Sequence, residues 1–471
     1  LIFRLINQSQ IINTFPLDTV NDSSSYMALL YFLNECGFHN LCPYWFNSFI
    51  SFQLTPPGWY FFVYPIYLIF NNYQITYFMS ILIIFLLSLF TIFKFGDIFK
   101  IGIEKRFLFF LLMFANAASI GNYIRLGRIP EFLSFLLFII IGFTILYYKN
   151  KKLDWKIVLL IPIYSLLLIT HQTFAILASL LWISLFLVKE KRGRIYLTLI
   201  VLVSLLIISF WLIPYLKNFF YSGGVNKPIG INILSFEDNY AFETTASIII
   251  PLVFLFIFYL YIKINKYDKK EILFYLPILI VTLLFLFRLT AFIPILNYIY
   301  PDVYMSFILF FTFFIFFKNF KINKEMLILI TIVSIISVLI NIFYTPFFIG
   351  HTQLETDTLE IMKDIKTNFL MTNTYSTTSY GKAYYSYAPI YLNVSTPSGW
   401  EKVATPEHYN NIGSFSKSIY DKDCKKTIAL SETLKVDYVI SYNEDCGTLD
   451  QCGLERVKKI NNVCLYKFKK I

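Results

Sequence analysis

The feature that most constrains this chain is a series of apolar runs, each about 17 to 23 residues long, that recur along most of its length. An α-helix rises about 1.5 Å per residue, so a helical run of this length crosses the hydrocarbon layer of a bilayer, which is about 30 Å thick. The composition agrees, because 57% of the residues are hydrophobic and only 15% are charged. Soluble domains have about 25% charged residues. The sequence therefore predicts a polytopic α-helical membrane protein and excludes an ordinary cytosolic enzyme.

Apolar runs bounded by charged residues predict about ten membrane-spanning helices. The stretch 157–188 is divided at His171, because a lone histidine at mid-bilayer would be costly, and two short helices that turn at this residue are expected instead. The predicted spans are 73–93, 107–124, 130–148, 157–170, 172–188, 195–216, 246–262, 272–290, 303–317 and 326–348.

The positive charges predict how these helices are oriented. Alternate loops hold nineteen Lys and Arg residues against seven Asp and Glu residues, whereas the intervening short loops hold five of each kind. Positive charge gathers in cytoplasmic loops. We therefore expect a multi-pass protein of the cell membrane whose amino-terminal loop and carboxy-terminal part are both extracytoplasmic. Because the net charge of +11 sits in loops between spans, it does not indicate a nucleic-acid partner.

The six cysteines all lie in the two outward segments, at Cys36, Cys42, Cys424, Cys446, Cys452 and Cys464. This distribution is typical of an oxidising compartment, where disulfides persist. We expect a Cys36–Cys42 bridge and two further bridges in the tail, whose pairing the spacing leaves open.

Three parts follow from these patterns. Residues 1–72 form an outer loop that ends in an aromatic stretch suited to an interfacial helix, residues 73–348 form the helical bundle, and residues 349–471 form a soluble α/β domain. In that domain the patterns predict helices at 358–366 and 425–434 and strands at 382–393, 436–442 and 463–468. An outward amino terminus without a signal would be hard to translocate, so a further helix is expected ahead of Leu1.

Three arginines, Arg125, Arg128 and Arg288, lie at predicted outer ends of spans, against the usual placing of positive charge. An arginine fork at this depth suits a phosphate group, because paired hydrogen bonds are strong where little water competes. These residues are candidates for binding the phosphate of a lipid-linked donor. The alternative is that Arg128 pairs with Glu131, three residues later, and that Arg288 extends to the surface.

Two acids, Asp18 and Asp22, precede a good helix start in the first outer loop. A carboxylate here suits a general base or a ligand for a divalent metal. Asp22 also fits the cap of the helix that follows it, and we prefer that role. Asp18 is the stronger candidate for chemistry.

His171, at a predicted outer helix end, suits donation to a phosphate or transfer of a proton, although a histidine bonded to backbone at a turn is commoner. Glu237 and Asp238, in a long outer loop, and Glu131 are candidates for binding the acceptor or a metal. For the loop acids, a solvated acidic surface is the simpler interpretation.

Short motifs follow one another in a fixed order on the predicted outer side. They are Asp18-Thr19, Cys42-Pro-Tyr-Trp-Phe-Asn-Ser48, Thr55-Pro-Pro-Gly-Trp59, Gly127-Arg-Ile-Pro-Glu-Phe132 and Thr170-His171, with Thr396-Pro-Ser-Gly-Trp400 as a weak echo in the tail. In these motifs and in its layout the chain resembles the GT-C superfamily of integral membrane glycosyltransferases. Within that superfamily it is most similar to the prokaryotic membrane family named 6-pyruvoyl-tetrahydropterin-synthase-related. It departs from that family in having Ser23-Ser24-Ser25 where a histidine is common.

The resemblance implies a GT-C-like fold and glycosyl transfer from a polyprenyl-phosphate-linked sugar to an extracytoplasmic acceptor, which is a protein, a lipid or a polysaccharide. It implies Asp18 as general base or metal ligand, with Mg²⁺ or Mn²⁺ as the candidate cofactor, and His171 as an aid to the leaving phosphate. One alternative is a membrane transporter or lipid flippase, which the lack of mid-bilayer charge and of an internal repeat disfavours. The other is a catalytically inactive GT-C-like scaffold. The oligomeric state stays open.

Overall fold

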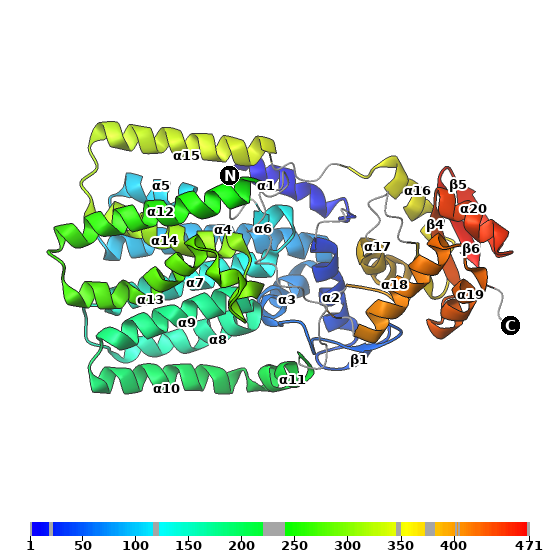
Figure 1. Ribbon diagram of the computed structural model, residues 1–471, viewed down its shortest axis with the longest axis horizontal. Helices are drawn as coiled ribbons and strands as arrows, with labels where there is room; N and C mark the ends of the chain where they lie inside the picture. The colour runs from blue at the N-terminus through cyan, green and yellow to red at the C-terminus, as the bar shows by residue number, and fades with distance from the viewer. Residues whose placement is uncertain are drawn as a thin grey trace.

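The computed structural model describes residues 2–17, 22–115, 122–219, 241–344, 350–372, 382–400, 403 and 406–468. Most of these residues are helical. The long helices run along the longest axis of the molecule, and the carboxy-terminal part lies beyond one end of them (Figure 1).

The long helices fit a membrane protein. Four described helices, within α4, α7, α12 and α14, are long and apolar enough to cross a bilayer, and a bent pair makes a fifth if it is counted as one span. The total of about ten spans stays a prediction. The helices of the first loop and the bundle are α1 (Ile2–Gln8), α2 (Ser23–Glu35), α3 (Gly58–Phe70), α4 (Tyr73–Ile98), α5 (Ile103–Phe114), α6 (Asn122–Arg125), α7 (Ile129–Tyr148), α8 (Leu160–Thr170), α9 (Gln172–Val188), α10 (Lys191–Ile207), α11 (Ser209–Phe219), α12 (Ala241–Ile264), α13 (Lys269–Leu286), α14 (Pro301–Asn319) and α15 (Lys324–Tyr344).

Helix α7 is the most deeply buried of the long helices, with nearly all of its apolar stretch inside the protein. It packs against α14 at Gly142, where a Cβ atom would lie 2.7 Å from the ring of Phe310. The rings of Phe138 and Phe143 flank the same ring, with centroids 5.5 and 5.0 Å away. Gly142 thus leaves room for the ring of Phe310 between α7 and α14, and small residues are common where membrane helices contact one another.

The turn predicted at His171 is confirmed. His171 has extended backbone and separates α8 from α9, so the apolar stretch is two helices. The span predicted at 195–216 is wrong in its outer third. The chain breaks at Ile208, and α11 is bent by 72° from α10.

The carboxy-terminal part combines a four-stranded sheet, of order β3-β4-β6-β5, with short helices. Strand β3 is parallel to β4, and the other pairs are antiparallel, with Ile440 opposite Leu465 in the central pair. The elements are α16 (Gln353–Met362), β3 (Phe369–Met371), α17 (Lys382–Tyr387), α18 (Pro406–Tyr420), α19 (Cys424–Thr433), β4 (Tyr438–Tyr442), α20 (Glu444–Gln451), β5 (Glu455–Ile460) and β6 (Val463–Lys467).

The predicted strand at 382–393 is wrong, because this stretch forms α17 followed by a π-helical turn, Ala388–Leu392. Pro389 has no N–H to donate to a sheet. Tyr384 and Tyr385 are adjacent and both buried, which an alternating strand would not permit. The strands predicted near 436–442 and 463–468 and the helix predicted near 425–434 are confirmed.

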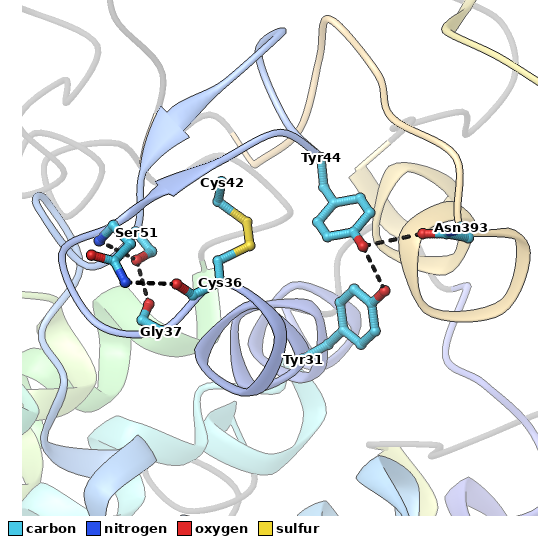
Figure 2. Close-up of a disulfide and its surroundings, with 8 residues drawn as sticks. Tyr31, Cys36, Gly37, Cys42, Tyr44, Ser51 and Asn393 are labelled. Carbon is cyan, nitrogen blue, oxygen red and sulfur yellow. Dashed lines mark hydrogen bonds between the residues drawn. A yellow bond between two sulfur atoms is a disulfide. The ribbon is translucent and has the colours of Figure 1, made fainter.

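The six cysteines form three disulfides, Cys36–Cys42, Cys424–Cys452 and Cys446–Cys464. The first bridge closes the turn between α2 and a two-stranded hairpin, β1 (Leu41–Cys42) and β2 (Phe49–Ile50), as Figure 2 shows. Beside it, the hydroxyl of Tyr31 donates to that of Tyr44, which donates to Asn393 of the tail, at 3.0 and 3.1 Å (Figure 2). The tail therefore contacts the first loop directly.

Candidate functional site

A buried group of charges lies where α7 and α14 begin. We call Arg128, Glu131 and Asp302 the Arg128 cluster; their side chains are all at least nine-tenths buried. The turn before α7 places the arginine. Gly127 has a positive φ of 69°, which suits glycine, and the N–H of Arg128 donates to the carbonyl of Tyr123 at 2.7 Å.

The guanidinium of Arg128 contacts both carboxylates. One terminal nitrogen lies 2.7 Å from Glu131 Oε2, and the other pairs with Asp302. The guanidinium also lies over the ring of Tyr300, 4.5 Å from its centroid, which is a favourable position for a cation. The predicted pairing of Arg128 with Glu131 is therefore confirmed, and Asp302 is a second partner. A phosphate that bound the terminal nitrogens of Arg128 would compete with these carboxylates.

His171 adjoins the cluster from the break between α8 and α9. Its Nδ1 lies 3.9 Å from Glu131 Oε1 and 2.7 Å from the hydroxyl of Thr173. The side chain is about four-fifths buried. A histidine, a carboxylate and an arginine from well-separated parts of the sequence thus share one region of the protein interior.

The start of α2 lies against the same turn. The N–H of Asp22 donates to the carbonyl of Leu126 at 2.9 Å, and the hydroxyl of Tyr77 bridges Ser23 and the carbonyl of Gly127. Asp22 occupies the cap position of α2, as predicted, but its side chain makes no capping hydrogen bond. It is buried beside the cluster's turn instead.

Three candidates cannot be placed. Asp18, Glu237 and Asp238 lie outside the described residues. Arg125 ends α6, but its side chain is outside the described part. Their roles stay predictions.

Arg288 lies apart from the cluster. It has a positive φ of 64° after α13, and its guanidinium donates to the carbonyl of Thr244 in α12, at 3.3 Å. No hydrogen bond or ion pair joins it to the Arg128 cluster within the described ranges. A phosphate role for Arg288 therefore stays a prediction.

The aromatic motifs of the first loop converge near His171. Gly58, at the start of α3, packs on the end of α8, where a Cβ atom would come within 2.8 Å of the carbonyl oxygen of Ile169. Trp59, the next residue, lies against Tyr26 of α2, with ring centroids 5.9 Å apart. The motif that begins at Thr55 and the pair Thr170-His171 are thus in contact.

The tail motif reaches the same place. Trp400 packs edge-on against Tyr26, at 5.1 Å between ring centroids. Gly399 lies on the ring of Trp45, and the indole N–H of Trp45 donates to the carbonyl of Tyr385 at 2.8 Å. Motifs from the first loop, α3, the α8–α9 break and the tail therefore form one continuous region.

The metal prediction finds no support in this region. Among the residues that the structure describes, no three His, Cys, Asp or Glu side chains lie as a metal site requires. The acids of the Arg128 cluster pair with an arginine instead. No step proposed below passes through a metal, and Mg²⁺ or Mn²⁺ stays a prediction.

Sequence reasoning missed Asp302 as a site residue, and with it Tyr123 and Tyr300. Asp302 follows Pro301 directly before the span predicted at 303–317. It is an ionisable residue at the end of a span, which is the feature that singled out Arg128. The pairing itself joins residues far apart in the sequence, which periodicity does not reveal.

Comparison with known proteins supports the fold. No protein-family model and no curated protein sequence matches the chain. An oligosaccharyltransferase of Archaeoglobus fulgidus, solved in complex with zinc and sulfate, has a TM-score of 0.57 and 12% identity over 94% of this chain and 67% of its own. The oligosaccharyltransferase AglB of the same organism, solved with an inhibitory peptide and a dolichol-phosphate, has a TM-score of 0.42 and 12% identity over 94% of this chain and 69% of its own. The second likeness is too weak to support a conclusion about this chain.

The first likeness shows that this chain shares its fold with that oligosaccharyltransferase. At 12% identity it shows the fold alone. Membership of the 6-pyruvoyl-tetrahydropterin-synthase-related family stays a prediction.

Proposed function

We propose that this chain is a glycosyltransferase of the cell membrane that moves a sugar from a polyprenyl-phosphate-linked donor to an extracytoplasmic acceptor. The observation that carries the proposal is the convergence of the Arg128 cluster, His171 and the motifs of the first loop and tail. The oligosaccharyltransferase-like fold is consistent with it. Ionisable groups kept at the end of a membrane bundle are costly, and such groups are commonly functional.

The reaction assigns a role to each group. The carboxylate of Asp18 accepts a proton from the attacking hydroxyl or amide of the acceptor, whose oxygen or nitrogen forms a bond to the anomeric carbon. The bond from that carbon to the phosphate oxygen breaks, and the polyprenyl phosphate leaves with the electron pair. Arg128, with Arg125 or Arg288, binds the phosphate, and His171 donates to it as charge develops.

In this proposal the described contacts of Arg128 form the resting state. Its two carboxylates hold the guanidinium in place and keep its charge compensated until a donor arrives. The phosphate then takes the place of one carboxylate. The donor enters from the bilayer, while the acceptor reaches the site beside the extracytoplasmic tail, 349–471.

A transfer assay in lipid nanodiscs tests the proposal. The purified chain is given radiolabelled polyprenyl-phosphate sugars, and release of labelled sugar to water or to acceptors is measured. Asp18→Asn should reduce turnover by at least about a hundredfold, the usual contribution of a general base. Asp421→Asn, which changes an exposed tail acid, should leave it unchanged.

Two results would contradict the proposal. Full turnover in Asp18→Asn would remove that residue from the chemistry. No turnover by the folded wild-type chain with any polyprenyl-phosphate sugar would favour the inactive scaffold.

A further inference from the structure

Helix α11 leaves the direction of the bundle. Only Ile208 separates α10 from α11, and the two helix axes differ by 72°. A helix that continues a span at this angle runs nearly parallel to the bilayer surface. It lies at the end of α10 nearest the tail, which is the predicted outer side (Figure 1).

One face of α11 is fastened to the protein. Trp211 is fully buried, and its indole N–H lies 3.2 Å from the carbonyl oxygens of both Phe52 and Thr55 in the first loop. Its ring stacks on Tyr215, one turn further along, at 4.7 Å between centroids. The helix is therefore bound to the loop that leads into α3.

The other face of α11 is apolar and exposed. Phe210, Ile213 and Leu216, spaced three residues apart, are 48%, 64% and 45% exposed. Lys217 follows them and is also exposed. An apolar face that ends in a basic residue is typical of helices lying in the membrane interface.

This face continues the lipid-facing surface of α10. That helix exposes an apolar series up to its last turn, namely Ile195, Leu199, Leu202, Val203, Leu206 and Ile207. On the other side, the ring of Phe210 lies 5.8 Å from that of Phe38, which lies 5.8 Å from Phe61 on the exposed side of α3. Exposed apolar residues of α10 and α11 and the ring contacts of Phe38 thus lead from α10, through α11, to the predicted interfacial helix α3.

We propose that α11 lies in the outer head-group layer of the bilayer, with Phe210, Ile213 and Leu216 in contact with the upper acyl chains. Its occupant is the bilayer surface, not a protein partner. Through Trp211, the helix fixes the height of the first loop above the membrane. This inference depends on the membrane topology and not on the proposed glycosyl transfer.

Depth-dependent quenching tests the position of α11. Because all six cysteines are in disulfides, a single added cysteine can carry an environment-sensitive fluorophore. Ile213→Cys is compared in nanodiscs with Leu199→Cys on the lipid-facing side of α10 and Tyr420→Cys, which is 73% exposed on the tail. Lipids brominated near the head group should quench Ile213 most, and lipids brominated near the chain ends should quench Leu199 most. Tyr420 should not be quenched.

An Ile213 signal as insensitive to every brominated lipid as Tyr420 would overturn the proposal. So would an Ile213 signal quenched most by lipids brominated near the chain ends, because α11 would then be part of a span. A blue-shifted but unquenched signal would mean that protein covers the face, which also contradicts it.

The link to the first loop has its own test. Trp211→Phe removes the indole donor but keeps an aromatic ring. A fluorophore at Ile50→Cys, on β2, should then show a shifted emission and an altered quenching profile. An unchanged profile would overturn the role of Trp211 in setting the height of the loop. Unchanged quenching at Leu199→Cys in the same background is the control for folding and insertion.

Discussion

At the residue scale, the Arg128 cluster combines one guanidinium with two carboxylates inside the protein. Charges removed from water are tolerated only when they are paired, and removing one partner of a buried pair is far more costly than the pair's net contribution. Asp302 lies 174 residues from Arg128 in the sequence and still contacts it. The cluster therefore joins α14 to the turn that precedes α7.

Arg128→Met should be strongly destabilising, because it leaves Glu131 and Asp302 close together and buried without their shared cation. We expect a loss of about 3–5 kcal/mol in the free energy of unfolding. Asp302→Asn should cost clearly less, since Glu131 still pairs with Arg128. Thermal unfolding in mild detergent measures both.

The matched control for this series is Arg192→Met, at an exposed position of α10, which should change stability by no more than about 0.5 kcal/mol. If Arg128→Met unfolds at the same temperature as that control, the cluster does not hold α14 against the turn that precedes α7. A greater loss in Asp302→Asn than in Arg128→Met would also contradict the ordering.

The sequence predicted the local part of this site and not the distant part. Arg128 and Glu131 are three residues apart on one helix start, so their pairing follows from helix geometry. The turn at His171 followed from the cost of a buried histidine. Asp302, by contrast, reaches Arg128 only because the fold brings the start of α14 to the turn before α7, which no local pattern encodes.

At the element scale, the tail packs closely against the first loop at Gly399. A Cβ atom at Gly399 would lie 2.7 Å from the ring of Trp45, which is fully buried and hydrogen-bonded to Tyr385. The large ring has no room to move, so an added methyl group must push the segments apart. We therefore expect the contact between Gly399 and Trp45 to help fix the position of the tail relative to the first loop.

Gly399→Ala should therefore loosen the tail, with a loss of about 1–3 kcal/mol typical of overpacking. Limited proteolysis should cut between the bundle and the tail faster than in the wild type. Gly413→Ala, in α18 where nothing lies within 4 Å of the added atom, is the matched control and should not increase cleavage. Equal cleavage of the two variants would show that the Trp45 contact does not hold the tail.

The predictions for two stretches, a strand at 382–393 and a single span at 195–216, are wrong for different physical reasons. The stretch 382–393 is rich in tyrosine, which favours strands, but its tertiary packing and Pro389 select helix. The stretch 195–216 is mostly apolar, and although Ser209 and Pro214 interrupt it, neither specifies a bend of 72° at Ile208. The hydrogen bonds of Trp211 to the first loop, which accompany that bend, are formed between residues more than 150 positions apart.

At the scale of the whole molecule, all proposals here require that the tail and the first loop lie on the same, outer side of the membrane. The structure places them together, because Tyr44 bonds to Asn393 and Trp45 to Tyr385. The distribution of Lys and Arg and the three disulfides of these segments both indicate that this is the outer side. An independent measurement of sidedness therefore tests the common premise.

Cysteine labelling in intact cells provides that measurement, since the native cysteines are all in disulfides. A membrane-impermeant maleimide should label Tyr420→Cys, on the tail, without any disruption of the cell. It should label Lys152→Cys, in an exposed Lys-rich loop at the opposite end of the bundle, only after permeabilisation. Labelling of Lys152→Cys from outside, with Tyr420→Cys protected, would invert the topology. The Arg128 cluster would then face the cytoplasm, where the charge rule already expects arginine, and its placement would no longer indicate a functional site.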